Sequence, residues 1–233
     1  MKKSRKTVLA IPIIVIVLIL GYASIMGIQI GINSPSLEFP IREEDRVTRL
    51  SAYYTPDWGE VGVYHNGIDL VISNNVTIIS PVRGTIISYS EKINPYAGNV
   101  LFKIAIAINL VWEVHLVLEP GFKDGTNNSI QSSLIDAPIG KQLSVGDELG
   151  TLLVSDSYPH LHYMLLYLGS DVCAYNHSSV TAKSVFEDIA LSSNSSIFFS
   201  HPELNPLLAP IGLMLISGIV TYIVIAIIIF KKN

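Results

Sequence analysis

Cysteine is almost absent from this 233-residue chain, which has only Cys173. A single cysteine excludes an internal disulfide and a cysteine-rich metal cluster. Basic residues are also scarce, with 15 lysines and arginines against 19 acidic residues. We therefore expect no nucleic-acid partner, because phosphate binding needs a basic surface.

Charge is missing altogether from two long apolar runs, residues 8–32 and 207–230. A helix needs about 20 apolar residues to cross the hydrocarbon core, and both runs reach that length. No clear A-x-A cleavage site follows the first run, which is longer than the apolar part of a usual signal peptide. The two runs are therefore predicted to be transmembrane helices, the first an uncleaved anchor.

The residues that flank the two runs indicate their orientation. Basic residues precede the first run and follow the second: Lys2, Lys3, Arg5, Lys6, Lys231 and Lys232. The positive-inside rule places both termini in the cytoplasm, so we expect a two-pass protein of the cell membrane with residues 33–206 outside. Nine basic residues remain in that external part, against all 19 acidic ones. N-x-S/T acceptor sequences at Asn75, Asn127, Asn176 and Asn194 agree with this placement.

The external part has the length of one domain, and its composition divides it further. We expect a cytoplasmic tail (1–7), a first span (8–32), a linker with the start of the external domain (33–58), a β-core (59–170), a helix with a juxtamembrane loop (171–206), a second span (207–230) and a second tail (231–233). Residues 33–40 have the turn-rich composition of a linker. We therefore expect the linker to lead into a mainly β domain.

The predicted β-core consists of short apolar runs separated by turn residues. Strands are predicted at 67–73, 77–79, 84–89, 99–108, 111–118 and 161–168. Residues 103–108 are almost continuously apolar, which is typical of a strand buried on both faces. No helical period of useful length occurs in this region, and one amphipathic helix is predicted at 179–191.

Histidines and a carboxylate form two patterns within the predicted strands. His65 and Asp69 are four residues apart at the start of one strand, and His160 and His162 are alternate residues of another. Alternate strand residues face the same side, so both imidazoles of the second pair would enter one cleft. His115 lies in a third predicted strand. Each pattern taken singly is also typical of an ordinary surface or hydrogen-bonded pair.

Taken together, these residues offer what a catalytic zinc site needs. Such a site takes three protein ligands from nitrogen and oxygen donors and keeps a fourth position for water. Two imidazoles and one carboxylate supply that set. Zinc lowers the pKa of a bound water towards about 7, and a further histidine can then exchange a proton with it.

The sequence also resembles the lysostaphin/LytM-type (M23) zinc metallopeptidases over about residues 60–168. The resemblance begins with Tyr64-His-Asn-Gly-Ile-Asp69 and Ser80-Pro-Val-Arg-Gly84. It continues with Gly98-Asn99-Val100, Glu113-Val-His115-Leu116 and Gly146-Asp-Glu-Leu-Gly150. It closes with His160-Leu-His162-Tyr163. This resemblance implies a compact antiparallel β-sheet, the LytM-like duplicated hybrid motif, with zinc in an open groove.

Residue by residue, the resemblance implies that His65, Asp69 and His162 bind Zn²⁺. It implies that His115 and His160 are catalytic residues that do not bind the metal, acting on the attacking water and the oxyanion. The function it implies is a zinc metalloendopeptidase acting on extracytoplasmic peptides, including cell-wall or surface peptides. Relatives commonly cut peptides of bacterial peptidoglycan.

Two departures from the family pattern mark further candidates. Tyr158, followed by a proline, replaces a small glycine-rich turn before His160 and could narrow the groove. Glu113 replaces the usual tyrosine two residues before His115, and strand alternation places it on the His115 side. A carboxylate there would orient His115 or reject acidic substrates, and the sequence leaves both open.

His177 and His201 are interpreted as ordinary polar residues, because the predicted zinc site is already filled without them. Two other functions remain open. One is a catalytically silent LytM-like module that docks a regulatory protein partner at the membrane surface; the retention of all five site positions favours the enzyme. The other is a solute-binding or structural membrane protein whose histidines are fortuitous.

Overall fold

The computed structural model describes residues 34–199, and the two predicted membrane spans lie outside them. In chain order the elements are η1 (Glu44–Arg46), β1 (Val47–Ser51), β2 (Ile68–Ile72), β3 (Val76–Ile79), β4 (Gly84–Ile93), β5 (Val100–Ala107), β6 (Trp112–Glu119), α2 (Gly125–Ser133), β7 (Gln142–Leu143), β8 (Glu148–Leu152), β9 (His160–Tyr167), β10 (Ser170–Val172), η2 (Ala174–His177) and α3 (Val180–Ser193). The mainly β class predicted from the sequence is confirmed, with antiparallel pairing between the named strands.

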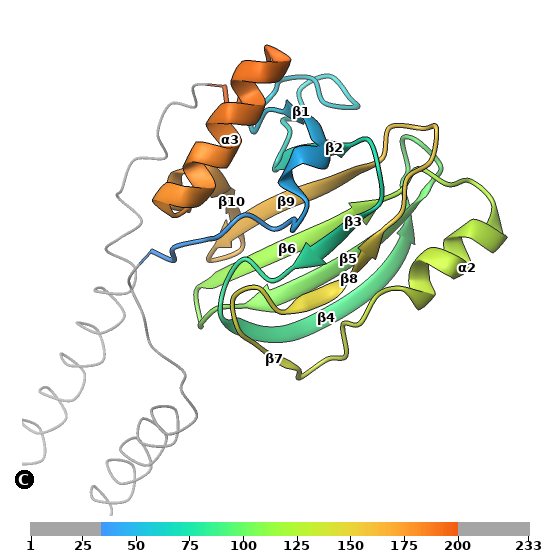
Figure 1. Ribbon diagram of the computed structural model, residues 1–233, viewed down its shortest axis with the longest axis horizontal. Helices are drawn as coiled ribbons and strands as arrows, with labels where there is room; N and C mark the ends of the chain where they lie inside the picture. The colour runs from blue at the N-terminus through green and yellow to red at the C-terminus, as the bar shows by residue number, and fades with distance from the viewer. Residues whose placement is uncertain (1–33, 200–233) are drawn as a thin grey trace, which may run out of the picture. The chain divides into compact units, whose positions relative to one another are not determined.

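One large curved sheet dominates the fold (Figure 1). Its strands follow the order β1-β2-β9-β6-β5-β4-β7, and β10 pairs with β9. The strands β3 and β8 form a separate two-stranded sheet, and α3 contacts β1. Because β2, β9 and β6 are neighbours, residues distant in the sequence meet across the middle of the large sheet.

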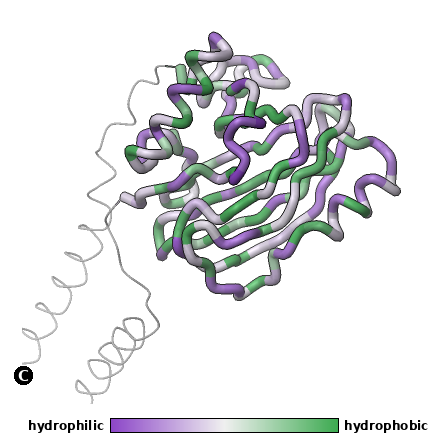
Figure 2. The backbone as a smooth tube through the Cα atoms, in the orientation of Figure 1, coloured by the Kyte–Doolittle hydropathy of each residue, from purple (hydrophilic) through white to green (hydrophobic). Residues whose placement is uncertain are grey.

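Strand alternation gives the large sheet two different faces. One face forms the core, with fully buried side chains such as Phe102, Ile104, Leu116, Leu161 and Tyr163. Residues from β3, β8 and α3 belong to the same hydrophobic cluster. Apolar residues accordingly recur along the strands in Figure 2. The opposite face carries the histidines of β6 and β9.

The six predicted strand runs and the helix at 179–191 are confirmed within a few residues. The interior of the 103–108 run, residues 104–106, is indeed buried on both faces. Four strands were not predicted. Of these, β1 comes from the expected linker region and pairs with β2.

One expectation about the β-core was wrong. Helix α2 occupies residues that were expected to form a turn, and the Asp124 side chain caps its start by accepting a hydrogen bond from the Asn127 backbone N–H. The helix buries only Gln131, so its sequence has no apolar period to detect. In the segment expected to be a linker with the start of the external domain, Leu37 and Phe39 are buried in the hydrophobic cluster.

Within residues 34–199, no helix has the length and apolar character that crossing a bilayer requires. The two apolar runs on which the membrane prediction rests fall outside that range. The predicted two-pass arrangement therefore stays a prediction.

Candidate metal centre

The two sequence patterns meet because β2 and β9 pair in a register that sets Asp69 directly opposite His162. His65 lies three residues before β2, and its ring reaches the same point. Asp69 Oδ1 lies 3.0 Å from His65 Nε2 and 2.7 Å from His162 Nδ1, and these two nitrogens are 3.2 Å apart. The potential ligand atoms of the three residues all lie within 4.8 Å of one another.

The remaining ring nitrogen of each histidine has a partner of its own. His65 Nδ1 donates to the carbonyl oxygen of Ala52 at 2.8 Å, and His162 Nε2 donates to Asn66 Oδ1 at 3.1 Å. These two contacts leave His65 Nε2 and His162 Nδ1 directed at Asp69 Oδ1. The three atoms together form a donor set that could hold a metal ion.

Burial sets the electrostatics of this centre. His65 and Asp69 are each 1% exposed, so the carboxylate has almost no contact with solvent. Burial alone would raise the pKa of Asp69. The hydrogen bonds of His162 and His65 and the charge of His160 outweigh it, and they hold the pKa well below its usual range. Asp69 is thus an anionic donor at neutral pH, as a metal ligand must be.

His160 lies beside the centre, on the same face as His162. Its Nδ1 donates to the carbonyl oxygen of Tyr158 at 2.9 Å. Its Nε2 lies 3.7 Å from Asp69 Oδ1 and 3.5 Å from Glu119 Oε1. Burial would lower the pKa of His160, but the hydrogen bond to Glu119 and the charges of Asp69 and Glu119 raise it to about 9.

The structure places His115 differently from His160. In β6 it lies opposite Met164, two residues beyond His162 in β9. Its Nε2 donates to Glu113 Oε2 at 2.9 Å, so Glu113 does lie on the His115 side. Burial lowers the pKa of His115 despite this carboxylate. The grouping that unites His65, Asp69 and His162 does not include His115.

Glu119 is the residue that sequence reasoning missed. It ends β6 directly opposite His160, and its pKa is lowered because the hydrogen bond and charge of His160 outweigh its burial. The sequence feature that could have indicated Glu119 is strand alternation, because His115 and Glu119 are four residues apart and so share one face. Periodicity alone does not say which of the two meets the His-x-His strand.

Aromatic side chains border the centre. Trp58 stacks on the ring of His65 with centroids 4.1 Å apart. Tyr158 contacts the ring of His160 at 4.9 Å, and its hydroxyl hydrogen-bonds the hydroxyl of Ser51. The predicted bulk of Tyr158 beside the histidine pair is therefore present.

The other two histidines lie apart from this group. His177 packs on Trp112 with ring centroids 4.9 Å apart, and it also contacts Ser34. Its pKa is lowered by burial. His201 falls outside the described residues.

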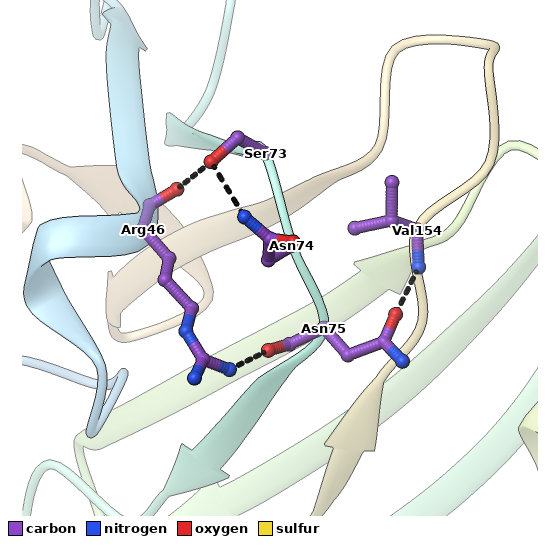
Figure 3. Close-up of a pocket in the computed structure, with 5 residues that line it drawn as sticks. All are labelled: Arg46, Ser73, Asn74, Asn75 and Val154. Carbon is purple, nitrogen blue, oxygen red and sulfur yellow. Dashed lines mark hydrogen bonds between the residues drawn. The ribbon is translucent and has the colours of Figure 1, made fainter.

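A separate polar pocket of about 480 Å³ lies at the turn between β2 and β3 (Figure 3). Its lining residues are Arg46, Ser73, Asn74, Asn75 and Val154. The Arg46 guanidinium donates to the carbonyl oxygen of Asn75, and Asn75 Oδ1 accepts from the Val154 backbone N–H. None of the predicted site residues lines this pocket.

The described fold is similar to solved structures of M23 and zinc-containing peptidases. A zinc-containing peptidase from Vibrio cholerae is 19% identical with a TM-score of 0.42, over 60% of this chain and 39% of that one. The catalytic domain of a prophage-encoded M23 protein from Enterococcus faecalis is 18% identical with a TM-score of 0.39, over 61% of this chain and 95% of that domain. The lysostaphin catalytic domain from Staphylococcus simulans is 17% identical with a TM-score of 0.37, over 54% of this chain and 87% of that domain.

No protein-family model and no curated protein matches the chain. The chain spans only about two fifths of the first structures that it resembles, 39% and 41% of their lengths. Because these identities are only 17–19%, the similarity shows the fold alone. A function for this chain therefore has to be argued from its own residues.

Proposed function

We propose that this chain is a zinc metalloendopeptidase whose metal ligands are His65, Asp69 and His162. One observation carries the proposal: ring nitrogens of a buried and a partly buried imidazole, His65 and His162, converge on one ionised carboxylate oxygen at 3.0 and 2.7 Å. Two nitrogens and one oxygen are the donor set of a catalytic zinc site.

The chain's own residues supply the rest of the site. A bound zinc ion would lower the pKa of a water molecule and polarise a peptide carbonyl. Ala52 and Asn66 fix the two ligand rings through their second nitrogens. His160 presents its Nε2 edge beside the metal centre, where an imidazole N–H can stabilise the oxyanion of the tetrahedral intermediate. We assign the catalytic histidine to His160 rather than to His115, because only His160 lies next to Asp69.

The test measures metal content and peptide cleavage together. The full chain, purified in detergent, should contain one zinc per molecule and should cleave members of a peptide library that includes cell-wall peptides. A chelator should abolish cleavage, and added zinc should restore it. Asp69→Ala should lose the zinc, because it removes the atom on which the other donors converge. Full zinc content in Asp69→Ala would overturn the assigned site.

The proposal includes a place in the cell. The uncharged runs 8–32 and 207–230, with basic residues on their outer flanks, support a two-pass membrane protein with its peptidase domain outside. Its substrates would then be extracytoplasmic peptides near the membrane surface. Protease added to intact cells should remove the domain and spare epitope tags at both termini. Cleavage of either tag would contradict the orientation.

A second candidate function has one observation in its favour. The β6 residue that faces His160 is the carboxylate Glu119, and His115 lies outside the metal group. A LytM-like module that has lost catalysis would retain zinc and dock a regulatory protein partner. Stoichiometric zinc with no cleavage of any library peptide would support this module over the enzyme.

A further inference from the structure

Glu119 lies beside the metal centre. The role inferred for it rests on the proposed peptidase function. The pairing of β6 with β9 sets Glu119 opposite His160 and Val117 opposite His162. Directly opposed residues of an antiparallel pair share one face of the sheet. Glu119 therefore lies on the face of the metal centre, in the row of His160.

Two asparagine side chains hold one oxygen of the Glu119 carboxylate in place. Its Oε2 accepts from Asn94 Nδ2 at 3.3 Å and from Asn99 Nδ2 at 3.5 Å, both in the turn that joins β4 to β5. Its Oε1 faces His160 Nε2 at 3.5 Å. The side chain is only 12% exposed. A buried carboxylate with one oxygen anchored by amides has its second oxygen pre-oriented for one partner.

The ring of His160 is fixed from both sides. Its Nδ1 donates to the carbonyl oxygen of Tyr158, so its Nε2 edge is the one that faces Glu119 and the metal centre. Two carboxylates flank this edge, Asp69 and Glu119. Asp69 is the proposed metal ligand, which leaves Glu119 as the carboxylate dedicated to His160.

We propose that Glu119 is the positioning residue of the catalytic site, holding the Nε2 edge of His160 toward the reacting centre, and that His115 has no part in catalysis. The ring of His115 is instead held by Glu113, opposite Met164. Glu119 acts through His160 and does not itself contact substrate. Removing its charge should leave the metal ligands in place and lower only the efficiency of the chemical step.

The first test compares Glu119→Gln with His115→Gln in the full chain. The Glu119→Gln substitution keeps the size of the side chain and an oxygen for the two asparagines. We expect kcat to fall about 10- to 100-fold, the range seen when a group that orients an active-site ligand is removed. KM and zinc content should stay at wild-type values. Glu119→Asp, which retains the charge, should recover part of the lost kcat, whereas His115→Gln should leave kcat near the wild-type value.

Three outcomes would overturn the inference. The first is a wild-type kcat in Glu119→Gln, and the second is a loss in His115→Gln as large as that in Glu119→Gln. The third is a fall in kcat that accompanies lost zinc, which would assign Glu119 a structural role only.

A second readout needs no catalysis. The chain has six histidines, so ¹⁵N-histidine labelling gives a simple spectrum, in which a His160→Gln variant identifies the signals of His160. We expect a His160 Nε2–H proton protected from exchange with water in the wild type, with and without zinc. The protection should be lost in Glu119→Gln and kept in His115→Gln.

Protection that persists in Glu119→Gln would contradict the positioning role even if no peptide substrate is ever cleaved. Loss of protection together with an inactive wild type would instead refute the peptidase function and leave the contact standing. The two proposals can therefore fail separately.

Discussion

Trp58 lies against the ring of His65, with ring centroids 4.1 Å apart and an angle of 25° between the planes. His65 is a proposed zinc ligand, and its ring is 1% exposed, whereas Trp58 is 36% exposed. The indole therefore covers one face of the ligand ring and presents its other side outward. A stacked aromatic pair contributes about 0.5–1.5 kcal/mol beyond the area that it buries.

Removing this cover should weaken zinc binding without abolishing it. We expect Trp58→Ala to raise the dissociation constant for zinc by up to about tenfold, because about 1.4 kcal/mol corresponds to a factor of ten. Competition with a chromophoric chelator measures the effect. Tyr96→Ala is the matched control, because Tyr96 is also an exposed ring of this region but packs at Gly59. An equal loss in Tyr96→Ala would contradict a specific role for Trp58.

Fluorescence gives an independent check of the same contact. The chain has two tryptophans, and the other, Trp112, packs on His177 and Tyr167. Binding of a paramagnetic ion such as Co²⁺ should quench the emission of Trp58. In Trp58→Phe the remaining emission should not respond to the same titration.

Asn66 should support the metal through His162. Its Oδ1 accepts from His162 Nε2 at 3.1 Å, which directs the other nitrogen of the ring at Asp69. Loss of such an outer partner typically reduces metal affinity by about 10- to 100-fold. We expect that loss in Asn66→Ala and wild-type affinity in Asn66→Asp, which keeps an acceptor oxygen. Equal affinities in the two variants would show that the contact does not orient the ring.

The three proposed ligands could be predicted from the sequence because each pattern is local. A strand places alternate residues on one face, so His160 and His162 had to share a side, and His65 is only four residues from Asp69. The meeting of the two patterns then required only that β2 and β9 be neighbours. The resemblance to M23 peptidases supplied that neighbourhood, which strand periodicity does not contain.

The choice between His115 and Glu119 could not be made from the sequence. Both residues lie on one face of β6, and a register shift of four residues would set His115 opposite His160 in place of Glu119. The register depends on long-range pairing of β6 with β9, which begins 41 residues after β6 ends. Helix α2 was missed for a different reason: it buries only Gln131, so side-chain capping and not apolar periodicity defines it.

Gly67 should be required for the geometry of the centre. A Cβ at this position would lie 2.7 Å from His162 Cε1 and 2.9 Å from the carbonyl oxygen of Tyr163, so the ligand ring would have to move. Overpacking of this kind costs about 1–3 kcal/mol. We expect Gly67→Ala to weaken zinc binding roughly tenfold or more, as measured by chelator competition. Gly125→Ala is the control, because a Cβ there meets no atom within 4 Å; equal affinities in the two variants would contradict the requirement.

The metal-free protein should lose stability as the pH rises from about 6 to about 10. Burial favours neutral His160, but the hydrogen bond to Glu119 and the charges of Asp69 and Glu119 outweigh it and raise the pKa to about 9 from 6.5. The folded state thus holds this proton more tightly than the unfolded state. The resulting stabilisation is complete below pH 6.5 and is lost as the pH rises through about 9. Thermal midpoints measured in excess chelator should fall by several degrees over this interval.

His160→Gln should remove this part of the slope of thermal midpoint against pH. Glu119→Gln should reduce the slope, because the substitution removes one of the charges that hold the proton on His160. A His160→Gln variant with the wild-type slope would show that another group carries the pH dependence.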